Sequence, residues 1–166
     1  MSISDLQEQD MGWYYEDFTP GRSIVTPRRT ITEADVIGFA GLSGDFNPLH
    51  VDELFAREAG YGGRIAHGPM VLGMALGMGA QAGLFSGTVL GMLGVQWAFH
   101  SPVRAGDTLH AVISVAGART TRKPGRGIVD LRFEIRSATQ ELVQSGQCQI
   151  MFACRTNRDM EQVAVQ

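Results

Sequence analysis

The stretch that decides the fold runs from Gly68 to Phe85 and reads GPMVLGMALGMGAQAGLF. Pro69 suits a first helical turn because its missing N–H would be unpaired there anyway. Apolar residues then follow on all sides of a helix as far as about Gly83. The apolar run itself, Met70 to Phe85, is shorter than the ~18 residues that a membrane span needs, and it contains Gln81. We therefore expect a helix buried on every side within a domain.

Downstream of this helix the hydrophobic period changes from helical to alternating. Apolar and polar side chains alternate from Val129 to Arg136, which predicts a strand with one buried face. Three more strands are expected, at residues 89–99, 109–115 and 142–152. Short connections between strands favour antiparallel neighbours, so we expect a meander. The sequence predicts an α+β domain in which a curved antiparallel sheet wraps the buried helix.

Upstream of the helix the chain carries shorter elements. Thr32-Glu33-Ala34-Asp35 is typical of a capping box and starts a helix that Ser43-Gly44 ends. A short helix is expected at 52–58 and a short strand at 23–26. The polar ends, 1–12 and 155–166, are expected to be flexible tails. We therefore expect one domain over residues 1–166 with a core at about 14–152.

Composition narrows the function classes. A net charge of -3 and a pI near 5.8 argue against nucleic acid as a partner. Cys148 and Cys154 fit no disulfide or metal framework, and the polar N-terminus does not resemble a signal peptide, so we expect reduced thiols and a cytoplasmic protein. Fourteen of the 21 glycines lie between Gly38 and Gly94, which predicts close approaches to the buried helix.

The most informative motif is Asp45-Phe46-Asn47-Pro48-Leu49-His50. A carboxylate and an imidazole five residues apart meet only if the chain turns between them. Asn47-Pro48 favours such a turn, because proline keeps the preceding residue out of the helical region. The residues alone leave two interpretations open: a catalytic pair, or turn caps beside a structural histidine.

A second candidate feature is Ala66-His67-Gly68-Pro69, where the apolar helix begins. The free N–H groups of a helix N-terminus can bind an oxyanion in a dry site, and Gly68 leaves room for a ligand. The alternative is that Gly68 is a simple N-cap and His67 a structural residue.

These segments together resemble the MaoC-like dehydratases, the (R)-specific enoyl-CoA hydratase (hydratase 2) family. The resemblance is carried, in the family's order, by the runs 15–21, 39–50, 63–68 and 99–107, and it spans roughly residues 14–152. It implies a hot-dog fold, a homodimer whose sheets join edge to edge, and a thioester site. It also implies reversible addition of water to a trans-2-enoyl-CoA, giving the (R)-3-hydroxyacyl-CoA, without a separate cofactor or a membrane.

The resemblance assigns roles by position. Asp45 and His50 would hold the catalytic water, the Gly68 N–H would bind the thioester oxygen, and Asn47 would hold the turn. Neutral imidazole is a suitable base toward water at pH 7. Which of Asp45 and His50 is acid or base stays open. The alternatives are a hot-dog acyl-CoA thioesterase and a non-catalytic acyl-CoA-binding protein.

Two features depart from the family's pattern. The central helix has no serine to support the acid, and Leu76 stands roughly where one is expected; Pro69 replaces a large apolar residue. Met70, Met74 and Met78 form a stripe that indicates core packing or an acyl tunnel. Four basic residues gather in one predicted hairpin: Arg119, Arg122, Lys123 and Arg126. They indicate either a solvated hairpin or a site for the phosphates of CoA. His100 and His110, expected on strands, lack metal-ligand spacing, so no metal site is predicted.

Overall fold

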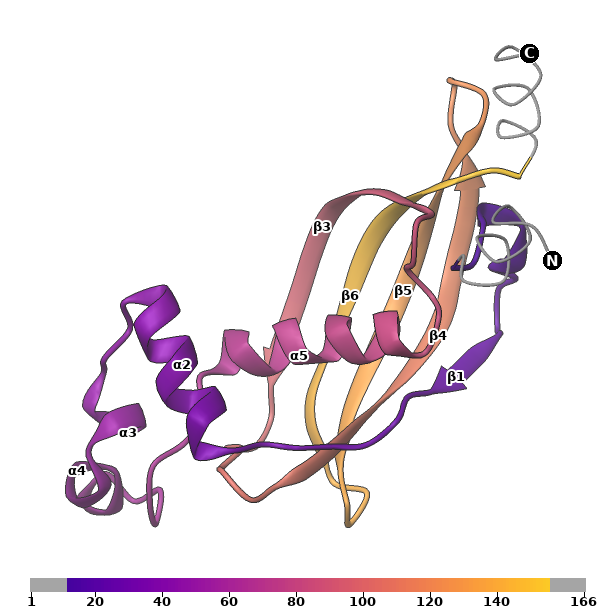
Figure 1. Cartoon of the computed structure of the whole chain (residues 1–166). Coiled ribbons are helices and arrows are strands. Elements are labelled where there is room, and N and C mark those ends of the chain that lie inside the picture. The colour runs from indigo at the N-terminus through magenta and orange to yellow at the C-terminus, as the bar shows by residue number, and fades with distance from the viewer. Residues whose placement is uncertain (1–11, 156–166) are drawn as a thin grey trace, which may run out of the picture.

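The computed structural model describes residues 12–155, so the predicted tails lie almost entirely outside the described residues. Helical segments form most of the first half of the described chain, and four long strands form the second (Figure 1). In chain order the elements are η1 (Tyr15–Asp17), β1 (Ser23–Val25), β2 (Arg29–Thr30), α2 (Glu33–Ser43), α3 (Pro48–Val51), α4 (Glu53–Glu58), α5 (Gly68–Gln81), β3 (Val89–Phe99), β4 (Thr108–Thr120), β5 (Arg126–Ser137) and β6 (Leu142–Ala153).

The strands form a six-stranded antiparallel sheet in the order β1-β4-β5-β6-β3, with β2 also paired to β4. The α+β prediction is confirmed, but the meander is wrong at one connection. β3 pairs with β6 and lies far from β4, its successor in the chain. Tertiary hydrogen bonds decide this path: the link between them donates from His100 N–H to Val143 O and from Gly106 N–H to Ile31 O. The chain therefore crosses from β3, at one edge of the sheet, to β4, which lies next to β1 at the opposite edge.

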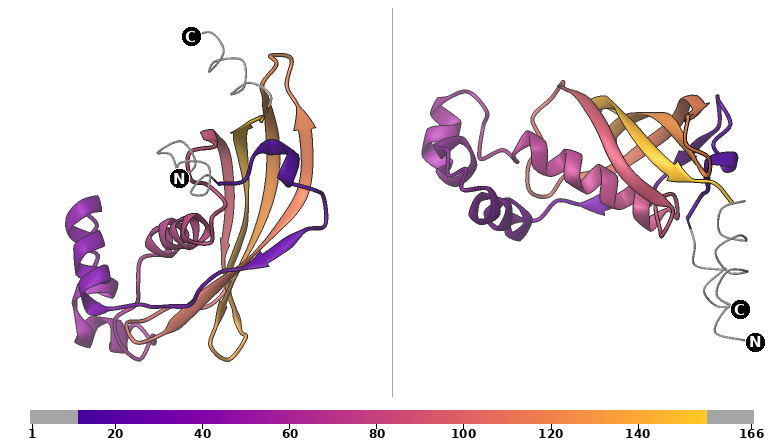
Figure 2. Two further views of the ribbon diagram at one scale, coloured as in Figure 1. Left: turned by 45° about the vertical axis from the view of Figure 1, so that its right-hand side comes forward. Right: turned by 90° about the horizontal axis from the view of Figure 1, so that it is seen from above.

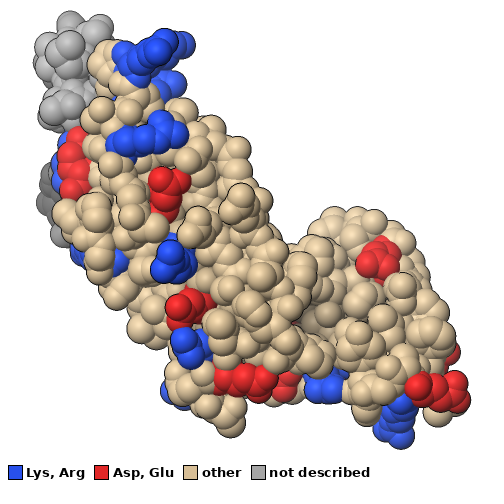
Figure 3. Space-filling model, turned by 180° about the vertical axis from the view of Figure 1, so that it is seen from behind, with Lys and Arg blue, Asp and Glu red and all other residues tan. Residues whose placement is uncertain are grey.

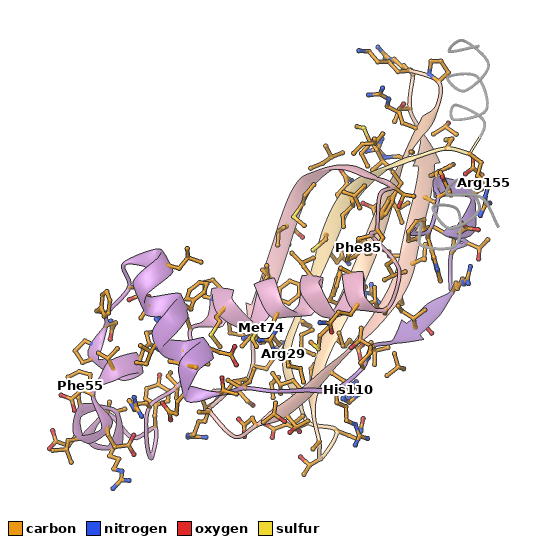
Figure 4. The ribbon with its side chains drawn as sticks, viewed as in Figure 1. Arg29, Phe55, Met74, Phe85, His110 and Arg155 are labelled. Atoms are coloured by element: carbon orange, nitrogen blue, oxygen red, sulfur yellow. The ribbon has the colours of Figure 1, made fainter. Side chains whose placement is uncertain are left out.

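The core lies between α5 and the concave face of the sheet, which curves around the helix (Figure 2). Alternate residues of β5 face this core and are almost completely buried, as the sequence pattern predicts: Val129, Leu131, Phe133 and Ile135. Met70 and Met78 are buried in the core and Met74 packs against that core, which favours core packing for the methionine stripe. Phe85, which follows α5, packs against Phe152 of β6 (Figure 4).

The prediction that α5 is buried on every side is wrong for a single chain. Its sheet-facing side is buried, but Gly73, Gly77 and Ala80 form an exposed stripe on the other side. The sheet covers only one side of the helix, and no other described element covers the stripe. Only Gly79 among the interior helix glycines meets a close neighbour, because a Cβ there would meet Phe85 and Ile113, whereas Gly73 and Gly77 face open space.

The helices before α5 begin and end close to where the sequence predicts. The Thr32 hydroxyl accepts a hydrogen bond from the Asp35 N–H, Asp35 accepts one from the Thr32 N–H, and Gly44 ends α2 with a φ of 75°. α4 starts after Asp52, its cap. α2, α3 and α4 lie beyond the sheet at the N-terminal end of α5 (Figures 1 and 2).

Two smaller predictions are refined. The turn expected at Asn47-Pro48 continues into the one-turn helix α3, because proline is favourable in a first turn and Asn47 caps it. His100 lies just after β3 rather than on it.

Cys148 and Cys154 are both free, and burial raises the pKa of the Cys148 thiol to about 11. Within residues 12–155, the helices are all too short or too polar to cross a bilayer.

Candidate active site

The structure brings Asp45 and His50 together within the group of helices α2, α3 and α4, which lies beyond the sheet. His50 Nε2 lies 3.9 Å from Asp45 Oδ2, with the imidazole largely buried and the carboxylate half exposed. This separation is too long for a direct hydrogen bond, and it leaves room for a water molecule bonded to both groups. The arrangement depends on the one-turn helix between the two residues.

Local hydrogen bonds hold Asp45 without help from a serine on α5. Its N–H donates to Ser43 Oγ at 3.2 Å, and its Oδ1 accepts from the Asn47 N–H at 3.2 Å. Asn47 Oδ1 in turn accepts from the Leu49 N–H at 3.1 Å and caps α3. Asn47 therefore orients the carboxylate through its backbone and starts the next helix with its side chain.

His50 is oriented by a backbone carbonyl. Its Nδ1 lies 2.7 Å from Ile65 O, and because a carbonyl only accepts, Nδ1 carries the proton in this pair. In the neutral ring Nε2 then has the free lone pair and faces Asp45. This is the tautomer that a base toward water needs. No sequence pattern indicates the role of the Ile65 carbonyl.

His67 belongs to the same cluster. The sequence motifs place it beside Gly68 but do not indicate that it contacts Asp45 and His50. It is 1% exposed, and its Nε2 donates to the backbone carbonyl of Asp45 at 2.9 Å. Its ring stacks on His50 with centroids 3.7 Å apart and an interplanar angle of 28°, and it also contacts Phe39. His67 thus touches both members of the pair from the N-cap of α5.

The segment that carries Ile65 and His67 is fixed by charges and backbone bonds. Arg64 pairs with Glu33 of α2 at 2.8 Å, and its N–H donates to Glu53 of α4 at 3.1 Å. This N–H is the main cause that holds the pKa of Glu53 below its ordinary value, with Arg57 adding to it. Ile65 N–H donates to Leu49 O and Ala66 N–H to Val103 O. The segment is therefore bonded to α2, α3 and α4 and to the link between β3 and β4.

A cavity of about 460 Å³ opens beside this cluster, and His50 and Gly68 both line it. Gly68 is in the first turn of α5, whose N–H groups have no partner within the helix and carry the positive end of its dipole. In this chain the lack of a side chain at Gly68 has a packing reason. A Cβ there would lie 2.6 Å from Cε1 of Phe99, which also lines the cavity.

Asp45, His50 and His67 are the donor types of a metal site, and one ligand atom from each lies within 4.8 Å of the others. The geometry does not favour coordination, since near-parallel stacked rings direct their lone pairs side by side. One nitrogen of each ring is also occupied by a backbone carbonyl. The cluster fits proton transfer better than metal binding.

The basic residues at positions 119–126 lie at the other end of the sheet. They lie from the last residues of strand β4, at Arg119, to the start of β5, at Arg126, and the 13 residues of β4 rise by roughly 40 Å from the cavity end. Figure 3 shows basic side chains at this end of the molecule. One chain therefore does not bring Arg119, Arg122, Lys123 and Arg126 to the cavity beside its own His50.

Helix, curved sheet and site together define a class of protein, the hot-dog fold with a polar cluster at the N-terminus of its central helix. A conserved hypothetical protein of Mycobacterium tuberculosis, described as having a double hotdog fold, superposes with a TM-score of 0.76 at 26% identity. The match covers 86% of this chain and 44% of that one.

Sequence comparison places the chain within that class. An (R)-specific enoyl-CoA hydratase of Rhodospirillum rubrum is 36% identical over 119 residues, 66% of this chain and 74% of that protein. Protein MaoC of Klebsiella aerogenes is 41% identical over 97 residues, which are 58% of this chain and only 28% of MaoC. Residues 17–134 match the MaoC like domain. The chain belongs to the MaoC-like domain family.

Proposed function

We propose that this protein is a hydro-lyase that adds water reversibly to a trans-2-enoyl-CoA, giving the (R)-3-hydroxyacyl-CoA. The observation that carries the proposal is the pairing of His50 Nε2 with Asp45 Oδ2 at 3.9 Å, next to the helix N-terminus at Gly68. The named activity of the Rhodospirillum relative supports the substrate class and the stereochemistry.

In this proposal the His50–Asp45 pair handles the proton of the attacking water. His50 Nε2 accepts a proton from water as the oxygen bonds to C3 of the enoyl group. The same proton equivalent is delivered to C2 through the pair, so both side chains end in their starting states. Water's hydroxyl and hydrogen are then both in the product.

The Gly68 N–H and the α5 dipole stabilise the charge that develops on the thioester oxygen. As the C3–O bond forms, electrons move from the double bond toward the carbonyl and give an enolate-like oxygen. A backbone donor preoriented in a cavity stabilises this charge more than bulk water does. No cofactor or metal is needed for this step, and CoA enters as part of the substrate.

We also propose that the enzyme acts as a cytoplasmic homodimer. β3 is the edge strand of the sheet and is exposed along most of its length, with large apolar side chains at Leu90, Leu93 and Phe99. An apolar unpaired edge is a favourable site for pairing with a second copy. Such a pairing would continue one sheet across both protomers.

The test is hydration of crotonyl-CoA, followed by loss of the enoyl-thioester absorbance and by chiral analysis of the product. We expect turnover by the wild type, and losses of at least about 100-fold in kcat for Asp45→Asn and for His50→Ala, as for removal of a general acid or base. Circular dichroism should show both variants folded, and a chelator should not change the wild-type rate.

The other outcomes separate the alternatives. Free CoA thiol in place of hydroxyacyl product would indicate a thioesterase. Tight acyl-CoA binding without turnover would indicate a non-catalytic binding protein. Full activity in both variants would contradict the assigned roles.

A further inference from the structure

Gln144 is a buried amide at a position where the strand pattern calls for an apolar residue. It is 3% exposed on β6, where the core-facing positions further along the strand include Cys148, Ile150 and Phe152. A primary amide carries two N–H groups and an oxygen with two lone pairs, and burying it is costly unless these are bonded. The hydration mechanism proposed above does not use this group.

The neighbouring strand fixes the orientation of the amide. Trp97 Nε1–H donates to Gln144 Oε1 at 2.8 Å. Gly146 makes this contact possible, because the Trp97 indole lies over it and a Cβ at that position would collide with the ring. With its oxygen held by Trp97, the amide must turn its NH2 group the other way.

The NH2 group is directed to the start of α5. Gln144 Nε2 lies 3.4 Å from Gly68 O, at the weak end of hydrogen-bond range. The nitrogen carries a second hydrogen, for which residues 12–155 supply no acceptor. Gln144 also lines the cavity that His50 and Gly68 share, so a ligand there can provide one.

Burial indicates which part of a ligand Gln144 meets. Tyr61, which is 37% exposed and does not lie on the β3 edge, lines the same cavity nearer to solvent. The CoA part of a thioester must leave through the solvent side, so the acyl chain reaches the deeper groups. The cavity lining includes no lysine or arginine, so a carboxylate beside Gln144 would be buried without a countercharge.

We propose that Gln144 is a specificity-determining residue, whose Nε2–H donates to a neutral oxygen on the acyl chain. The preferred substrates are then enoyl thioesters that carry a hydroxyl, ether or carbonyl oxygen beyond the double bond. This inference rests on the proposed hydratase activity. Sites that hydrogen-bond a substrate group discriminate strongly against analogues that lack it, because their own polar group is left unpaired.

The test uses pairs of substrates that differ by one atom. In 4-methoxybut-2-enoyl-CoA and 5-methoxypent-2-enoyl-CoA, an ether oxygen replaces one methylene of hex-2-enoyl-CoA and hept-2-enoyl-CoA. For each pair we take the ratio of kcat/KM, oxygen over carbon, in the wild type and in Gln144→Met, which keeps length but has no donor. Because intrinsic reactivity is the same for both enzymes, the change in ratio reports the contact.

We expect the ratio to fall by about tenfold in Gln144→Met for at least one pair, as for loss of one hydrogen bond. Trp97→Phe keeps Gln144 and removes the group that orients it, so its ratio should also fall, by less. This second variant decides the matter if Gln144→Met does not fold.

Unchanged ratios in the variant that folds would overturn the proposal. An equal loss on oxygen and carbon substrates would assign Gln144 to packing and would overturn it too. If the wild type hydrates none of the four substrates or crotonyl-CoA, it is the proposed function that fails, a result distinct from unchanged ratios.

Discussion

At the scale of single residues, His67 links three parts of the candidate site that come from separate stretches of the chain. Its N–H holds the backbone of Asp45, its ring covers one face of His50, and Gly68 follows it directly. With Nε2 donating, its Nδ1 is left buried without a partner among the described residues. We therefore regard His67 as a positioning residue that acts through Asp45 and His50.

Two variants of His67 separate its two contacts. His67→Phe keeps a ring to stack on His50 and loses the donor to Asp45 O, whereas His67→Gln keeps a donor and loses the ring. We expect each to lower kcat on crotonyl-CoA by about tenfold, the effect of one hydrogen bond or contact. KM should change little, because substrate contacts remain. A loss confined to melting temperature, with kcat per folded enzyme unchanged, would show that His67 only supports the fold.

His110, on β4, should make stability depend on pH (Figure 4). Burial lowers its pKa below the ordinary value of 6.5, and the positive charges of Arg28 and Arg136 add to the effect. As pH falls below 6.5, the unfolded chain takes up a proton that the folded one does not. The free energy of unfolding should then fall by up to about 1.4 kcal/mol per pH unit.

Urea unfolding between pH 7.5 and 5 measures this slope. His110→Gln should show a flatter dependence than the wild type, and His100→Gln, at an exposed histidine, should match the wild type. Equal slopes in all three proteins would rule out His110 as the source.

The sequence motif predicts the residues of the site better than their partners. Asp45, Asn47 and His50 lie close in the chain, so turn chemistry alone brings them together. His67 and Gln144 join the site through the packing of α5 on α3 and β6, which no local pattern contains. A polar residue within the alternating core-facing positions of β6 was the one available signal for Gln144.

At the scale of elements, the start of α5 packs so closely against Phe99 that residue 68 has no room for a side chain. A methyl group at Gly68 would lie 2.6 Å from the Phe99 ring, so Gly68→Ala must shift the ring or the helix start. Such a shift moves the N–H proposed to bind the thioester oxygen. We expect kcat to fall by at least about tenfold, since preoriented oxyanion donors contribute about 100-fold or more.

Gly38→Ala is the matched control, because Gly38 lies within α2 and faces open space. It should keep full activity and gain up to about 1 kcal/mol in unfolding free energy. Adding Phe99→Leu to Gly68→Ala should restore part of the lost kcat. If Gly68→Ala is fully active, the proposed oxyanion role of this helix start is wrong.

Elements with strong local signals match the sequence prediction, and those set by partners do not. The capping box and the glycine stop define α2, and alternation defines β5. The place of β3 beside β6 depends on hydrogen bonds from the 100–106 link to distant segments, so loop length alone misassigned it. The sequence does not predict the exposed side of α5, because an apolar helix can be covered by its own chain or by a second one.

At the scale of the whole molecule, the two edges of the open sheet differ in length and in exposed apolar side chains. β3 is 11 residues long and exposes large apolar side chains such as Leu90 and Leu93, whereas β1 at the other edge has only three residues. Short edge strands are a common protection against pairing, and a long apolar edge is not. The long edge is therefore the one expected to pair with a second copy.

Light scattering on the purified protein should give the mass of a dimer. Leu90→Lys with Leu93→Lys places two charges on the β3 edge, where both side chains are half exposed in one chain, so the folded protomer tolerates them. We expect this variant to be monomeric, since burying both charges on pairing is unfavourable. Val25→Lys, on the β1 edge, should remain dimeric because its side chain is already exposed there. A wild-type monomer, or a Leu90→Lys/Leu93→Lys variant that still dimerises, would contradict pairing through β3; a monomer with full hydratase activity would mean that one chain forms the complete site.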